Sequence, residues 1–90
     1  MKTIYKYSIS PENPRLEVGL PDVATVVFVD SQLTGWVHFW IEFTPDEKMH
    51  TRTFVLHGTG HTIPADHKYV GSVLDPPFVW HLYEVDREAA

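Results

Sequence analysis

Alternation of side chains along an extended chain is clearest between Gly35 and Phe43. One face of this segment carries Val37, Phe39, Ile41 and Phe43, and the other carries Trp36, His38, Trp40 and Glu42. Successive side chains of a strand point to opposite faces, so this period of two predicts a β-strand. Because both faces are largely apolar, we expect burial on both sides, with the fold core on one side and a partner subunit on the other.

Six more segments have the composition of short strands, and proline or glycine separates most of them. The expected strands cover residues 3–9, 15–18, 25–30, 35–43, 49–57, 68–74 and 78–85. This spacing predicts an all-β fold of about seven short antiparallel strands in a sandwich or small barrel. Pro64–His67 is the best helical fragment, so at most one helical turn is expected. Residues 1–90 are expected to form a single β domain.

Composition narrows the classes of partner. The chain of 90 residues has no cysteine and a formal net charge of −5. An acidic protein is a poor partner for a nucleic acid polymer, whose phosphates must be neutralised by many lysines and arginines. No long apolar run is present, so we expect no membrane segment. A small domain without disulfides often gains stability by oligomerising, which favours a homodimer.

The segment from His57 to His67 departs from plain strand sequence. Gly58 and Gly60 flank Thr59 directly after an apolar strand, which predicts a turn with exposed amides that can bind an anion. Hydroxyl, imidazole and guanidinium donors nearby would complete such a site. The expected ligand-binding residues here are Arg52, Gly58, Thr59, Gly60, His61 and Thr62. The alternative is a turn whose glycines only let the chain reverse.

Aromatic rings supply a second candidate surface. Trp36 and Trp40 share one face of their strand, and flat rings of this kind can stack on a nucleotide base. Tyr69 is a third candidate for such a contact. Equally, the tryptophans are typical of a sandwich core or a subunit interface. The sequence leaves core, interface and ligand platform open for Trp36 and Trp40.

Metal binding and catalysis are weaker alternatives. His57, His61 and His67, with Asp66, are chemically suitable zinc ligands, but they are spread over a loop without a cysteine. His57-Gly-Thr59 matches only half of the paired motif of two-histidine phosphoesterases, and no serine lies in a nucleophile elbow. We therefore expect no metal, no cofactor and no enzymatic activity.

Four short motifs resemble a family of small phage-encoded proteins of about this length. They are Lys2-Thr-Ile-Tyr-Lys-Tyr7, Arg52-Thr-Phe54, Gly58-Thr-Gly-His61 with Ile63-Pro64, and Tyr69-Val-Gly71. That family is similar to phage sponge proteins, which bind cyclic-nucleotide immune signals. The resemblance implies sequestration without cleavage, by a small homo-oligomer in the host cytoplasm. Residues 11–43 match none of the family's motifs.

The sequence thus favours a phage-encoded binding protein that sequesters a small anionic nucleotide and so counters anti-phage defence, and the resemblance implies that this nucleotide is a cyclic immune signal. The alternative is a protein–protein interaction module of a phage, which would use its aromatic strands to bind a host or virion protein.

Overall fold

The protein is a sandwich of two antiparallel sheets. The computed structural model describes residues 1–45 and 47–86, and this part of the chain forms seven strands and no helix. The strands are β1 (Thr3–Ile9), β2 (Arg15–Leu20), β3 (Thr25–Asp30), β4 (Val37–Phe43), β5 (His50–Gly58), β6 (His67–Asp75) and β7 (Phe78–Val85). No helix of the described chain is long and apolar enough to span a membrane.

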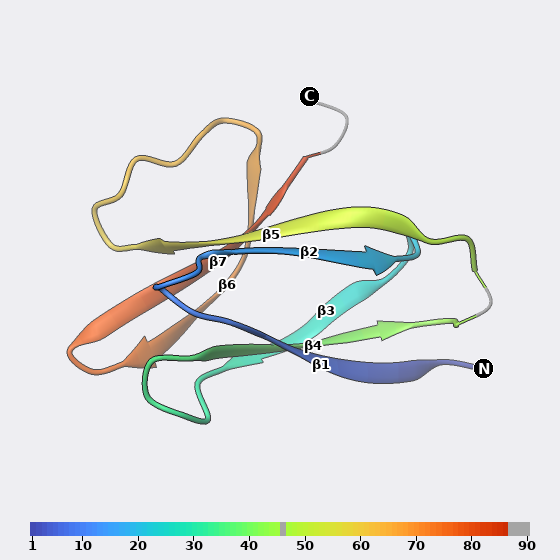
Figure 1. Ribbon diagram of the computed structural model, residues 1–90, viewed down its shortest axis with the longest axis horizontal. Coiled ribbons are helices and arrows are strands. Elements are labelled where there is room, and N and C mark those ends of the chain that lie inside the picture. Colours follow the sequence, from blue (N-terminus) through green and yellow to red (C-terminus); the bar gives the residue numbers. More distant parts are fainter. Residues whose placement is uncertain (46, 87–90) are drawn as a thin grey trace.

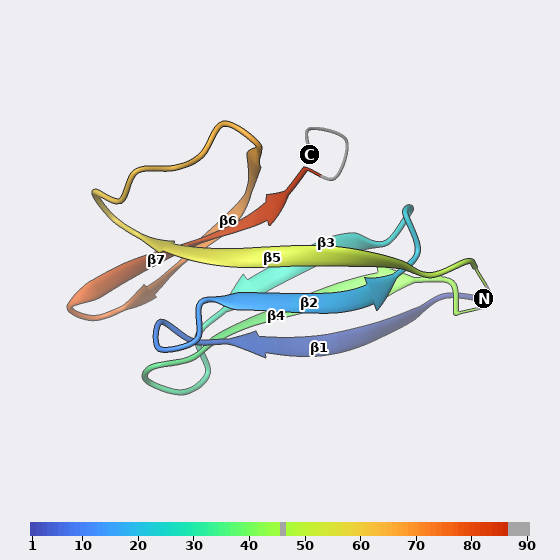
Figure 2. The same ribbon diagram turned by 45° about the horizontal axis from the view of Figure 1, so that its top comes forward.

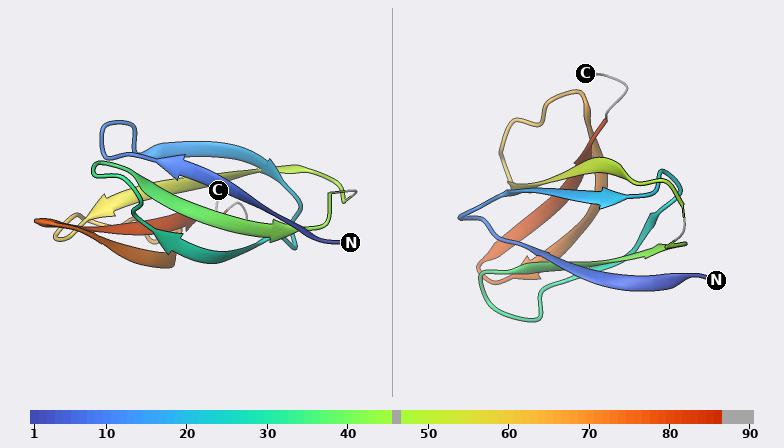
Figure 3. Two further views of the ribbon diagram at one scale, coloured as in Figure 1. Left: turned by 90° about the horizontal axis from the view of Figure 1, so that it is seen from below. Right: turned by 45° about the vertical axis from the view of Figure 1, so that its right-hand side comes forward.

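The strands divide into a three-stranded sheet, β1-β4-β3, and a four-stranded sheet, β2-β5-β7-β6. Figure 1 and Figure 2 show β2 and β5 in one layer above β1 and β4 in the other. Within the larger sheet, β7 and β6 turn steeply away from β5, as Figure 3 (right) shows, which is the twist that β-sheets normally adopt. The hairpin of β6 and β7 therefore crosses the direction of β4.

The core lies between the sheets and contains the inward side of β4. Val37, Phe39, Ile41 and Phe43, which alternation places on one face, are all buried, so this face is the one that forms the core. Phe39 packs across the sandwich on Phe54 of β5, with 4.9 Å between ring centroids. Both rings are fully buried, so they contribute strongly to the free energy of folding.

The two sheets approach closely where β3 meets β6. Gly71 lies on β6 at this seam, and a Cβ atom added to it would stand 3.0 Å from Cγ2 of Val29. Any side chain at position 71 would push β3 and β6 apart. At the opposite edge, β1 and β2 are joined by the short turn at residues 10–13, which holds an isolated bridge between Ser10 and Asn13.

The predicted fold class is confirmed, and the strands at residues 3–9, 25–30 and 78–85 begin and end where the sequence places them. β2 continues two residues further than predicted, to Leu20. Pro64–His67 forms a hydrogen-bonded turn, with the amide of His67 donating to the carbonyl of Pro64, and not a helix.

Candidate functional site

A β-bulge in β6 builds a polar cluster on the outer face of the four-stranded sheet. The register of β6 against β7 shifts between Tyr69 and Gly71. Without the extra residue, alternation would turn Ser72 towards the core; with it, Ser72 lies opposite His81 and Tyr69 lies opposite Tyr83. The histidine face, as we call this cluster, consists of His57, Thr59, His67, Tyr69, Ser72, His81 and Tyr83.

A continuous chain of hydrogen bonds runs across the histidine face. Tyr69 Oη lies 2.8 Å from Ser72 Oγ, and Ser72 Oγ lies 2.7 Å from Nδ1 of His81. The other ring nitrogen of His81, Nε2, lies 3.0 Å from Oγ1 of Thr59. A neutral imidazole has one donor and one acceptor nitrogen, so the chain has a single direction at any moment. The four groups can reverse together when a ligand donates to or accepts from one end.

Beside this chain lies a group of three imidazoles. His57 Nε2 is 3.0 Å from His67 Nδ1, and the ring centroids of His57 and His61 are 6.3 Å apart. Burial holds the pKa of His57 below its ordinary value, and repulsion from His67, His61 and His81 lowers it further. His57 is therefore neutral at pH 7, and an anion bound here would raise its pKa again.

The turn after β5 places Thr59 and His61 at the edge of this cluster. The amide of His61 donates to the carbonyl of Gly58, and Gly60 has a φ of 91°, as the third position of a type II turn requires. The amide of Gly58 donates to Nδ1 of His61, whose ring folds back over Gly58. One of the amides expected to bind an anion, that of Gly58, is thus engaged within the turn, while Thr62 is exposed further along the loop, which arches outward in Figure 1.

The structure places the predicted ligand residues in separate regions. Residues 58–62 and Tyr69 lie on or beside the histidine face. Trp40 belongs to the outer side of the three-stranded sheet, where it pairs with Lys6 and Phe28, and Trp36 precedes β4 and lines the small pocket between β1 and β2. Arg52 lies in the interior. One small ligand on the histidine face therefore cannot contact all of the residues that the sequence grouped together.

Arg52 joins β5 to β7 and to the connection between β2 and β3. Its Nε and Nη2 atoms donate to both carboxylate oxygens of Glu84 at 2.6 and 2.7 Å. Its Nη1 donates to the carbonyls of Pro21 and Ala24 at 3.0 and 2.7 Å. The hydrogen bonds to Glu84 raise the pKa of this guanidinium. With these donors engaged and a side chain only 12% exposed, Arg52 serves the fold and lies away from the loop that it was expected to assist.

Sequence reasoning missed Ser72, His81 and Tyr83 as members of the site. Alternation along β7 is regular, so the shared face of His81 and Tyr83 was readable from their spacing. The outward position of Ser72 could not be predicted in this way, because it depends on the bulge in β6 and the sequence pattern does not reveal where a bulge occurs.

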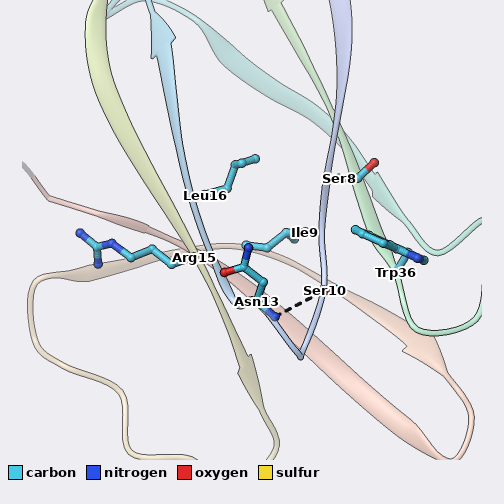
Figure 4. A pocket seen from close by; sticks show the side chains of 7 residues that line it. All are labelled: Ser8, Ile9, Ser10, Asn13, Arg15, Leu16 and Trp36. Atoms are coloured by element: carbon cyan, nitrogen blue, oxygen red, sulfur yellow. Dashed lines mark hydrogen bonds between the residues drawn. The ribbon is translucent and has the colours of Figure 1, made fainter.

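The described side chains of the histidine face do not form a metal-binding set. Within residues 1–45 and 47–86, no three histidine, aspartate or glutamate side chains converge to hold a metal ion. A pocket of about 60 Å³ lies elsewhere, at the edge between β1 and β2, where Ile9, Leu16 and Trp36 contribute to its wall (Figure 4). Pockets for drug-sized ligands occupy about 300–1,000 Å³, so this one is too small for a nucleotide.

Comparison with known proteins assigns a family. The model of a domain of unknown function, DUF7352, matches residues 1–90, and the chain belongs to that family. No curated protein and no solved structure matches the chain.

Proposed function

We propose that this member of the DUF7352 family is a binding protein that captures a small phosphorylated ligand of the nucleotide class on the histidine face. One observation carries the proposal: Tyr69, Ser72, His81 and Thr59 form one hydrogen-bonded chain on an outward sheet face, beside a group of imidazoles. Polar side chains on a solvent-facing strand can satisfy their hydrogen bonds with water, so a chain of mutual hydrogen bonds is not required by the fold.

The chemistry of the histidine face suits a nucleotide. Hydroxyl and imidazole groups donate to phosphate oxygens, and imidazoles that become protonated neutralise the charge of the ligand. Tyr69 is 61% exposed and packs edge-on against Tyr83, with centroids 5.6 Å apart, so its ring is held in place for stacking on a base. Arg52 and the tryptophans are not needed for this mode of binding.

Capture fits the geometry better than turnover does. Ser72 and His81 form a hydroxyl–imidazole pair of the kind that nucleophilic enzymes use, but the second nitrogen of His81 meets the neutral Thr59. A carboxylate in that place would stabilise the imidazolium that forms during nucleophilic attack. His57 and His67 are bonded to each other, which suits binding a ligand and not passing protons through a reaction.

The resemblance to phage sponge proteins narrows the proposed ligand further. On that basis we extend the proposal to a cyclic nucleotide immune signal, sequestered in the host cytoplasm by a phage-encoded protein and so withheld from anti-phage defence. The pocket between β1 and β2 is too small for a ligand of this size, which supports placing it on the outer face of the sheet.

Calorimetry against cyclic dinucleotides, cyclic trinucleotides and a linear dinucleotide tests the proposal. His81→Phe removes both ring nitrogens and leaves Ser72 and Thr59 without their partner, so we expect affinity to fall about 10- to 100-fold. Lys48→Ala is the matched control, because Lys48 is an exposed cation in the loop between β4 and β5, at the other end of β5 from the histidine face, and is expected to leave affinity unchanged.

The ligand should be recovered intact by chromatography after release from the protein. Conversion of the ligand by the wild-type protein, abolished in Ser72→Ala, would establish an enzyme instead. Wild-type protein that binds none of the three ligand classes, or equal affinity of the His81→Phe and wild-type proteins, would refute the proposal.

A further inference from the structure

The outer face of the three-stranded sheet is apolar where water should meet it. Its central row consists of Lys6, Trp40 and Phe28, which the strand register places side by side. Phe28 is 56% exposed and Ile4 is 52% exposed. The aromatic face, as we call this surface, consists of Ile4, Phe28, His38 and Trp40. Contiguous exposed rings of this kind are typical of a protein interface.

A second β-bulge creates this face. The register of β3 against β4 shifts between Val26 and Phe28, so Val26 faces the core opposite Ile41 while Phe28 faces outward opposite Trp40. Simple alternation would send Phe28 inward with Val26. The bulge instead brings the ring of Phe28 to 5.3 Å from that of Trp40.

The rings on the aromatic face are already packed against one another. His38 points to the outside of the sheet and is nevertheless only 5% exposed, with its ring 6.4 Å from that of Trp40. A surface side chain this deeply covered shows that the face forms a second apolar layer, and one side of that layer is open. Covering that side would remove apolar area from water, the main driving force for association.

The two edges of the aromatic face carry charges of opposite sign. The β1 edge carries the cations Lys2 and Lys6, whereas the β3 edge carries Asp30. Lys2 pairs with Glu42 on the central strand. Lys6 reaches over Trp40 and donates to Gln32, and Asp30 accepts from the amide of Ser31. One edge is thus basic and the other acidic, with rings between them.

We infer that the aromatic face binds a second copy of this chain, with a two-fold axis running along β4. This axis lays the basic β1 edge of each copy over the acidic β3 edge of the other, and Lys6 comes within one row of the partner's Asp30. Trp40 packs on its own equivalent at the centre, as an isologous interface requires. An axis across the strands would instead stack β1 on β1 and oppose like charges.

Charge reversal tests this arrangement, with sedimentation equilibrium at micromolar concentration as the measurement. In the proposed dimer, Lys6 of each copy lies near Asp30 of the other, so this contact occurs twice. Lys6→Glu places two carboxylates at each contact, and Asp30→Lys places two cations there. Each variant should raise the dimer dissociation constant about tenfold or more. The double variant Lys6→Glu with Asp30→Lys restores opposite charges and should return the constant to near the wild-type value.

Glu17→Lys is the control, because Glu17 is an exposed carboxylate on β2 of the other sheet, and it should leave the dimer intact. Circular dichroism checks that each variant is folded. A monomeric wild-type protein would overturn the inference and favour another protein as the occupant of the face. A dimer that is insensitive to both single reversals, or a double variant that stays monomeric, would overturn it as well. None of these outcomes depends on nucleotide binding, which is assigned to the opposite sheet.

Discussion

The two outer faces of this sandwich differ more than its two inner faces do. Inward, both sheets present the same kind of side chain, such as Phe39 on β4 and Phe54 on β5. Outward, the three-stranded sheet presents stacked rings flanked by separated charges, while the four-stranded sheet presents hydroxyl, phenol and imidazole groups joined by hydrogen bonds. Folding requires only that the inward-facing side chains be apolar. The outward-facing side chains are free to differ between the two sheets, so each sheet can serve a different function.

Each outer face depends on a β-bulge that turns one side chain outward. In β3 it turns Phe28 outward next to Trp40, and in β6 it turns Ser72 outward next to His81. Bulges interrupt the pairing of strands and are common near functional sites for this reason. The same device thus gives one sheet an apolar surface and the other a polar one.

The largest expected effect comes from the interior that both faces share. Arg52→Ala leaves Glu84 and two carbonyls without their donor, and breaking a buried ion pair of this kind costs about 3–5 kcal/mol. Urea unfolding measures this loss, and Arg15→Ala should change the free energy of unfolding by no more than about 0.5 kcal/mol. If Arg52→Ala is as stable as wild type yet loses nucleotide binding, Arg52 belongs to the ligand site.

An intermediate effect is expected at the turn that supports the histidine face alone. Gly60 has space for a side chain but a φ of 91°, so Gly60→Ala should cost about 1–3 kcal/mol through backbone strain. Gly19→Ala is the matched control, since Gly19 also has open space but no positive φ. Dimerisation should be unchanged in both variants. Equal unfolding free energies for the two variants would show that the turn relaxes without strain.

The smallest expected effect is the pH dependence of the free energy of unfolding. One histidine on each outer face, His57 or His38, tests it. Burial is the main cause that lowers the pKa of both His57 and His38; other histidines add to it for His57, whereas for His38 Lys6 lowers the pKa and Asp30 opposes it. A lowered pKa in the folded state means that the unfolded chain takes up the proton first. The stability contributed is therefore present above about pH 6.5 and is lost as the pH falls through the folded-state pKa.

Unfolding free energies measured between about pH 7 and pH 5 should therefore decline. His57→Gln and His38→Gln should each flatten part of that decline, and a cyclic nucleotide should restore stability at low pH only through the histidine face. A slope that is unchanged in both variants would place the titrating groups elsewhere.

β4 and Arg52 show what the sequence could and could not predict about the structure. Alternation alone divided the side chains of β4 between two faces, because a period of two is a direct consequence of strand geometry. Both faces are largely apolar, so the pattern did not tell which of them forms the core. Arg52 was expected to assist the loop at residues 58–62, because it precedes that loop on the same strand. The structure shows instead that its guanidinium donates to the carboxylate of Glu84, 32 residues away in the sequence, a partner that no local pattern identifies.

The rest depended on interactions that no local pattern records. Ser72 and Phe28 face outward only because one residue is added to a strand pair, and the position of a bulge depends on both strands. Gly60 was identified correctly as a turn glycine, since positive φ is a local requirement. Gly58 has a different reason to be glycine, because His61 and Trp80 occupy the space of a side chain there.

The missing side chain at Gly71 also sets how this sandwich can move. At that seam β3 and β6 touch through Val29, whereas β1 and β2 enclose a small cavity at the opposite edge. If the two layers separate locally, we expect the gap to open at the edge with the cavity and not at the glycine seam. The amides of Ile9 and Leu16 should then exchange hydrogen with solvent faster than those of Val29 and Gly71, which hydrogen-exchange measurements can test.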